Sequence, residues 1–104
     1  MDLNYTDIMT ELKDFRDQRH WQQYHTLPEL ARAMMVEAGE VNECFLWSNS
    51  TTTLSPQQEA DLKLELADVL TYLYYMCDKL NVTPNELVQQ KFDLNQHRHW
   101  KFDH

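Results

Sequence analysis

Residues 65–73, Glu65-Leu66-Ala67-Asp68-Val69-Leu70-Thr71-Tyr72-Leu73, place two acids inside a stretch that otherwise has the pattern of a buried helix. Apolar residues recur there at spacings of three and four, the repeat of one face of an α-helix. The acids keep the same rhythm on a neighbouring stripe. The pattern predicts a helix from residue 56 to about residue 80. Its apolar stripe comprises Leu62, Leu66, Val69, Leu73, Met76 and Leu80, and its second stripe comprises Glu65, Asp68, Tyr72 and Tyr75.

A second helix, predicted from residue 27 to about residue 47, repeats this arrangement. Glu37 and Glu40 lie in the middle of a stripe whose two ends are apolar. The polar connection formed by residues 48–54 is long enough to turn the chain back, so we expect the two helices to be antiparallel. Because packed helices have axes roughly 8 to 10 Å apart, the two acid pairs would then come within reach of one cation.

Each of the three prolines stands one or two residues after a Ser or Thr that can cap a helix by accepting a backbone amide hydrogen bond. A Glu or Gln three residues after each cap completes the pattern of a capping box. An earlier helix, from residue 5 to about residue 19, follows from apolar residues at spacings of three and four. The three capping segments are Thr26-Leu27-Pro28-Glu29, Ser55-Pro56-Gln57-Gln58 and Thr83-Pro84-Asn85-Glu86.

Four helices and no competing strand pattern predict an all-α fold, with residues 1–104 forming one domain and a four-helix bundle-like protomer. A chain of 104 residues has a small core, because only about 60 to 70% of the unfolded surface leaves water in a domain of this size. An oligomer would bury additional surface. We therefore expect a dimer or a dimer of dimers.

The composition of the chain argues against several classes of protein. The net charge of −8 argues against a nucleic-acid partner, since such proteins usually present a basic stripe. No stretch has the ~18 to 20 apolar residues of a membrane span, and the first residues lack the pattern of a secretory signal, so a cytoplasmic location is expected. The single glycine, Gly39, excludes the Gly-rich loops that cradle phosphates in P-loop and Rossmann proteins.

The four acids indicate a divalent-metal site. Either pair alone is most often a solvated helix face, but two pairs on the inward stripes of two helices would form a cluster of like charge that needs a cation. Ligands that offer only oxygen favour Mg²⁺, with Mn²⁺ as a possible substitute. Since Mg²⁺ commonly shares its coordination with substrate phosphates, a nucleotide substrate is expected.

A di-iron carboxylate bundle is the obvious competing metal site, because it also places acids inside four helices. Such bundles require a Glu-x-x-His motif. None of the five histidines stands three residues after a glutamate, so the sequence disfavours iron. Calcium loops of the EF-hand type are absent as well.

Two further segments allow more than one interpretation. Residues 16–25 combine basic and aromatic residues, and they are either a polar turn in which Trp21 closes the core or a nucleotide pocket. In the pocket, Trp21 or Trp47 would stack on a base and His25 would hydrogen-bond to it. Near the other end, one face of the last helix carries polar residues that could bind phosphate, although such a row is more often solvated. This row comprises Lys91, Asn95 and Arg98.

Taken together, these residues resemble the all-α MazG-like nucleoside triphosphate pyrophosphohydrolases, particularly the compact dCTP pyrophosphatase-like branch. The similarity extends over most of the chain. It is carried by Phe15, Arg19, Trp21 and His25; by Glu37-Ala38-Gly39-Glu40 with Phe45-Leu46-Trp47; by residues 65–73; and by Lys91 with Asn95. One departure is Gln18, which stands where an acid is common in the family.

The resemblance implies a role for each group of residues. The four acids would hold Mg²⁺, which grips the triphosphate, and Glu37 or Glu40 would act as the catalytic base. Spacing does not choose between the roles of ligand and base. The residues implied at the nucleoside are Trp21, His25, Trp47 and Tyr72, and those implied at the phosphates are Lys91, Asn95 and Arg98.

The activity implied is hydrolysis between the α- and β-phosphorus atoms of a (deoxy)nucleoside triphosphate, with dCTP or a related deoxynucleotide as substrate. The products are a nucleoside monophosphate and pyrophosphate, and the role is the removal of unwanted nucleotides. Family members are dimers or tetramers whose sites draw on more than one subunit. The alternative is a non-catalytic helical module that senses nucleotides or binds a partner.

Overall fold

The computed structural model describes residues 4–49 and 53–97, and helices are the only regular structure within them. Four α-helices and one short 3₁₀-helix account for the regular structure: α1 (Tyr5–Gln18), η1 (Gln22–Tyr24), α2 (Leu27–Glu43), α3 (Pro56–Lys79) and α4 (Pro84–Gln96). The all-α prediction is confirmed. No helix among the described residues has the length and apolar character needed to cross a membrane.

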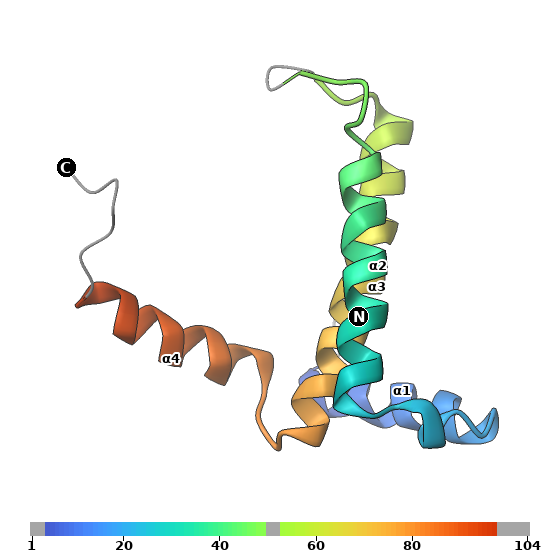
Figure 1. The fold of residues 1–104 in the computed structure, drawn as a ribbon, viewed down its shortest axis with the longest axis vertical. Helices are drawn as coiled ribbons and strands as arrows, with labels where there is room; N and C mark the ends of the chain where they lie inside the picture. Colours follow the sequence, from blue (N-terminus) through green and yellow to red (C-terminus); the bar gives the residue numbers. More distant parts are fainter. Residues whose placement is uncertain (1–3, 50–52, 98–104) are drawn as a thin grey trace.

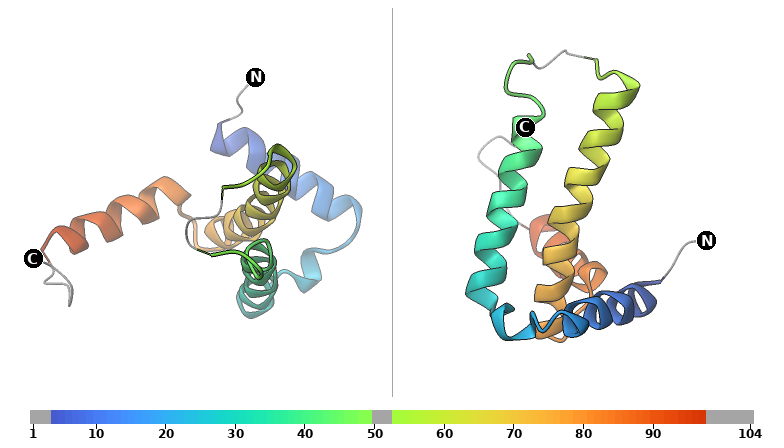
Figure 2. Two further views of the ribbon diagram at one scale, coloured as in Figure 1. Left: turned by 90° about the horizontal axis from the view of Figure 1, so that it is seen from above. Right: turned by 90° about the vertical axis from the view of Figure 1, so that its right-hand side faces the viewer.

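Helices α2 and α3 form an antiparallel hairpin that dominates the molecule (Figure 1). Helix α1 crosses one end of this hairpin, near the start of α2 and the end of α3 (Figure 2). Helix α4 leaves the same end and projects away from the hairpin (Figure 1). The four helices therefore do not all run alongside one another in a single protomer, which differs from the bundle-like packing expected from the sequence.

The helix starts follow the predicted capping residues. The hydroxyl groups of Thr26, Ser55 and Thr83 each accept a hydrogen bond from a backbone amide three residues later. At Ser55 the Gln58 side chain also accepts a hydrogen bond from the Ser55 backbone amide, which completes a capping box. A fourth cap, in which Asn4 accepts from the amide of Asp7 at 2.9 Å, lies at the start of α1.

Helix α2 ends at Glu43, which is earlier than predicted. Residues 44–47 continue as tight turns, in which Phe45 and Leu46 donate to carbonyls only three residues back. This change of winding takes Trp47 out of the stripe that carries Glu37 and Glu40. The side chain of Trp47 is 97% exposed.

The core lies where α1, α2 and α3 meet. Met9, Leu30 and Tyr75 are buried together, one from each helix. This cluster fixes the end of the hairpin near α1. The partly buried residues packed against it are Tyr5, Leu12, Tyr72, Tyr74 and Met76.

Helix α1 ends in a Schellman motif that the sequence did not reveal. His20 has a positive φ of 58°, its amide donates to the Asp17 carbonyl at 3.1 Å, and the Trp21 amide donates to the Arg16 carbonyl at 3.1 Å. This pattern of two bonds around a left-handed residue satisfies the last carbonyls of a helix, and glycine usually occupies the left-handed position. The usual apolar contact of the motif is present, because the rings of Trp21 and Phe15 meet edge to face at 5.7 Å.

We expect His20→Gly to raise the free energy of unfolding by about 1 kcal/mol, because a residue with a Cβ atom is disfavoured in the left-handed region. Urea unfolding measures the change. Gln18→Gly is the matched control, since Gln18 lies two residues earlier inside α1 and glycine there should lower stability by up to about 1 kcal/mol. Equal losses in both variants would contradict the assignment of His20 to a strained position.

Candidate metal centre

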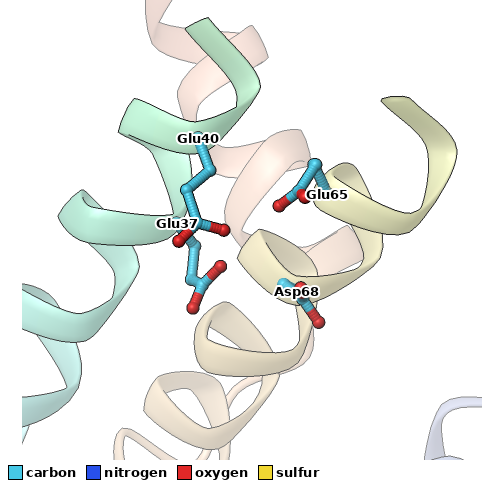
Figure 3. Close-up of side chains that lie close together, drawn as sticks. All are labelled: Glu37, Glu40, Glu65 and Asp68. Atoms are coloured by element: carbon cyan, nitrogen blue, oxygen red, sulfur yellow. The ribbon is translucent and has the colours of Figure 1, made fainter. Parts of the chain in front are cut away.

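The hairpin brings the four acids together across its two helices. Glu37 and Glu40 extend from α2 toward α3, which contributes Glu65 and Asp68 (Figure 3). One carboxylate oxygen from each residue lies within 4.8 Å of the others. The antiparallel arrangement expected from the sequence therefore places both pairs at one site.

Two carboxylate oxygens of the cluster lack hydrogen-bond partners within the described part of the chain, so they are free to bind a cation. The Oε2 atoms of Glu37 and Glu65 are buried and have no hydrogen-bond partner among the described residues. Buried polar atoms are normally paired with protein or water. A divalent cation fits this set, because all four donors are carboxylate oxygens and hard cations such as Mg²⁺ prefer oxygen ligands.

Like charge and burial act on the protonation of the cluster. The pKa of Glu37 is raised by burial, by its hydrogen-bonding contact with Glu40 and by the charges of Glu40 and Asp68. The pKa of Glu65 is raised by its contact with Glu40, by burial and by the charges of the other three acids. Without a cation, the cluster therefore takes up protons more readily than isolated carboxylates do.

An aromatic cavity of about 240 Å³ opens beside the acids. Glu37 and Asp68 form its acidic edge, and Trp21, His25 and Tyr72 belong to both this cavity and an adjoining one of about 350 Å³. Three helices and the segment between α1 and α2 thus contribute to one hollow. The remaining residues around the smaller cavity are Leu12, Phe15, Thr71 and Tyr75.

The other two acids border a different hollow. The second hollow is a depression of about 370 Å³ lined by Glu40, Glu43, Cys44, Asp61, Leu64 and Glu65. The acid cluster consequently borders an aromatic cavity and an acidic depression. An apolar group of a ligand could enter the first, whereas an anionic group would need a cation to offset the four carboxylates of the second.

The imidazole of His25 is held among aromatic groups. Its ring meets the ring of Tyr75 edge to face, with 4.5 Å between centroids. Burial, together with the positive charges of Arg16 and Lys79, lowers the pKa of His25. The ring is therefore neutral near pH 7, so it presents one nitrogen as a hydrogen-bond donor and the other as an acceptor.

The structure brings together only part of the residue set derived from the sequence. The four acids, Trp21, His25 and Tyr72 gather around one site. Trp47 is exposed and lines neither cavity beside the acids. Lys91 and Asn95 belong to α4, which projects away from the hairpin (Figure 1), and Arg98 lies outside the described residues.

Sequence reasoning did not assign Tyr75 to the site, although its position carried a signal. Tyr75 continues the stripe of Glu65, Asp68 and Tyr72 at helical spacing, and it forms part of the cavity wall. Phe15 and Thr71 also line the cavity. The spacing of Tyr75 would have sufficed to place it beside the acids.

Comparison with known proteins identifies relatives along most of the chain. Residues 33–103 match the MazG-like family. The chain is 33% identical over 97 residues to dCTP pyrophosphatase 1 of Mus musculus and to that of Homo sapiens, an overlap of 89% of this chain and 57% of each relative. The chain thus spans little more than half the length of these relatives.

A solved structure matches over nearly the whole chain. The crystal structure of a pyrophosphatase from Archaeoglobus fulgidus DSM 4304 is 31% identical, with a TM-score of 0.74 and coverage of 97% of both chains. The arrangement of helices described above is therefore shared with a protein of the same extent.

The raised pKa values of Glu37 and Glu65 predict how the metal-free protein responds to pH. Acids with a raised folded-state pKa bind protons on folding, so their contribution to stability is fully present below the unfolded value and is lost as pH rises through the folded value. In EDTA, we expect the Tm to fall as pH rises above about 4.5, the ordinary pKa of a glutamate. Thermal melts check this.

The double variant Glu37→Gln/Glu65→Gln is the control for the pH response, because it removes both shifted groups. Its Tm should fall less than that of the wild type over the same pH interval. If the pH dependence is unchanged in the variant, the cluster is not the source of the effect.

Proposed function

The chain belongs to the MazG-like family, and on that basis we propose that it is a nucleoside triphosphate pyrophosphohydrolase formed by one domain. It hydrolyses (deoxy)nucleoside triphosphates, with dCTP or a related deoxynucleotide as the preferred substrate, to a monophosphate and pyrophosphate. Removal of unwanted nucleotides from the pool is the role that this reaction serves. The observation that carries the proposal is the cluster of four carboxylates with two buried, unpaired oxygens.

The proposed cofactor is Mg²⁺, for which Mn²⁺ can substitute, held by Glu37, Glu40, Glu65 and Asp68. When bound, a divalent cation supplies charge neutralisation for the triphosphate and for the transition state of phosphoryl transfer. Glu37 or Glu40 accepts a proton from the attacking water as the water oxygen bonds to the α-phosphorus. The bond from that phosphorus to the bridging oxygen then breaks, and pyrophosphate departs.

The aromatic cavity is the proposed site of the nucleoside. Trp21 and Tyr72 offer flat apolar surfaces for a base, and the His25 ring offers a nitrogen for a hydrogen bond. The acids at the cavity edge would then lie next to the phosphates of the same nucleotide. Trp47 remains a proposed contact only through a neighbouring subunit or a rearranged turn, because its side chain projects into solvent.

We assign the phosphate-side residues of α4 to a neighbouring copy of the chain. Lys91 and Asn95 lie on a helix that points away from the acids of its own protomer (Figure 1). That helix exposes Val88 and Phe92, which lie one turn apart on one face, and Leu94 on another face. Exposed apolar surface of this kind commonly marks an interface. A homodimer or a dimer of dimers would cover it. Arg98 is included in this proposal as an extension of the same row.

Incubation with each deoxynucleoside triphosphate and Mg²⁺ tests the reaction. We expect monophosphate and pyrophosphate, with Glu40→Gln and Asp68→Asn each lowering kcat by about 100-fold or more, because each removes a charge from the proposed cation site. Glu59→Gln is the matched control, since Glu59 is an exposed acid of α3 paired with Lys63 at 3.3 Å.

The products also separate the proposed enzyme from its alternative. Release of orthophosphate with a diphosphate would contradict cleavage between the α- and β-phosphorus atoms. Nucleotide binding without turnover, under conditions in which the protein is folded, would favour the non-catalytic sensing module. Full activity in both acid variants would overturn the metal assignment.

A mixture of two inactive variants tests the shared site. In an equal mixture of Glu40→Gln and Lys91→Ala, half of the reassociated dimers carry both variants, and one of their two sites combines intact acids with an intact Lys91. Random mixing should therefore restore about a quarter of wild-type activity. Activity that stays at the level of the separate variants would place Lys91 and the acids of each site on the same chain.

A further inference from the structure

Tyr75 connects three parts of the protomer at the wall of the aromatic cavity. Its side chain is only 6% exposed. Its hydroxyl group donates to the backbone carbonyl of Leu12 in α1 at 2.8 Å, and its ring meets the His25 ring edge to face. A single residue of α3 therefore contacts both α1 and the segment that leads into α2.

The orientation of His25 depends on packing. Its Nδ1 atom is buried and has no hydrogen-bond partner among the described residues. Functional histidines are commonly oriented by a hydrogen bond to one ring nitrogen, and Nδ1 makes no such bond here. The contact with Tyr75, at 4.5 Å between ring centroids and an interplanar angle of 66°, constrains the ring in its place.

Both the hydroxyl group and the ring of Tyr75 are held by neighbouring residues. The hydrogen bond to Leu12 uses the only hydrogen of its hydroxyl group, and the ring is packed with Met9 and Leu30 in the core. The Arg16 guanidinium lies 5.9 Å from the ring centroid. Because the core holds Tyr75 so firmly, a side chain packed against its ring edge has little freedom to rotate.

We propose that Tyr75 is a positioning residue that holds the His25 ring at the cavity wall, where the ring contacts a bound nucleotide. The inference rests on the proposed function for the identity of the ligand. Tyr75 acts on the substrate through His25.

A double-mutant cycle tests the coupling. We expect Tyr75→Leu and His25→Ala each to raise KM about tenfold with kcat changed by less than about twofold, because both remove binding without touching the acids. The double variant should have the KM of His25→Ala alone, since Tyr75 has no further effect once His25 is absent. An increase in KM equal to the product of the two separate effects would overturn the proposal.

Two milder variants keep the test decisive if Tyr75→Leu fails to fold. Tyr75→Phe retains the ring and loses the bond to Leu12, so KM should rise by only about two- to threefold. Tyr74→Phe is the matched control, because Tyr74 is the adjacent residue and its ring packs against Tyr5 at 5.3 Å. Equal effects of Tyr74→Phe and Tyr75→Phe on KM would contradict a specific role for Tyr75.

A spectroscopic measurement needs no turnover and so separates this inference from the proposed function. In the nucleotide-free protein, the His25 ring proton resonances should shift in Tyr75→Phe and stay in place in Tyr74→Phe. Addition of a non-hydrolysable deoxynucleoside triphosphate analogue with Mg²⁺ should move the His25 ring proton resonances of the wild type. Ring resonances that stay in place in Tyr75→Phe, or that do not respond to the bound analogue in the wild type, would overturn the proposal even in an active enzyme.

Discussion

Mutual repulsion among four carboxylates is the constraint on which the rest of this structure depends. Two helices hold one oxygen of each acid within 4.8 Å of the others, and two buried oxygens lack partners among the described residues. Protons or a bound cation in the cluster would relieve this repulsion. The antiparallel α2–α3 hairpin thus holds four like charges together at one place, where a cation would offset them.

The remaining elements complete a site around that cluster. Helix α1 closes one end of the hairpin, and its Schellman motif turns the chain so that Trp21 packs against Phe15 beside the acids. Tyr75 fills the junction of the helices and contacts His25. The same small core that joins the three helices consequently forms the wall of the cavity, so stability and ligand binding depend on shared residues.

Sequence patterns predicted the features that depend on local chemistry. The capping residues Thr26, Ser55 and Thr83 mark the helix starts, and the spacing of the acids places them on facing stripes. The turn at His20 was not predictable in this way, because the left-handed position carries no glycine. The position of α4 was also missed, since its capping signal fixes where the helix begins and says nothing about what covers its apolar face.

The central claim is that the cluster holds a divalent cation, and a Mn²⁺ titration followed by electron paramagnetic resonance tests it most directly. The wild-type protein, free of other metals, should bind Mn²⁺ saturably, and excess Mg²⁺ should displace it. Glu65→Gln should lose this binding while retaining its helical content by circular dichroism. Equal Mn²⁺ binding by the wild type and the folded variant would contradict the claim.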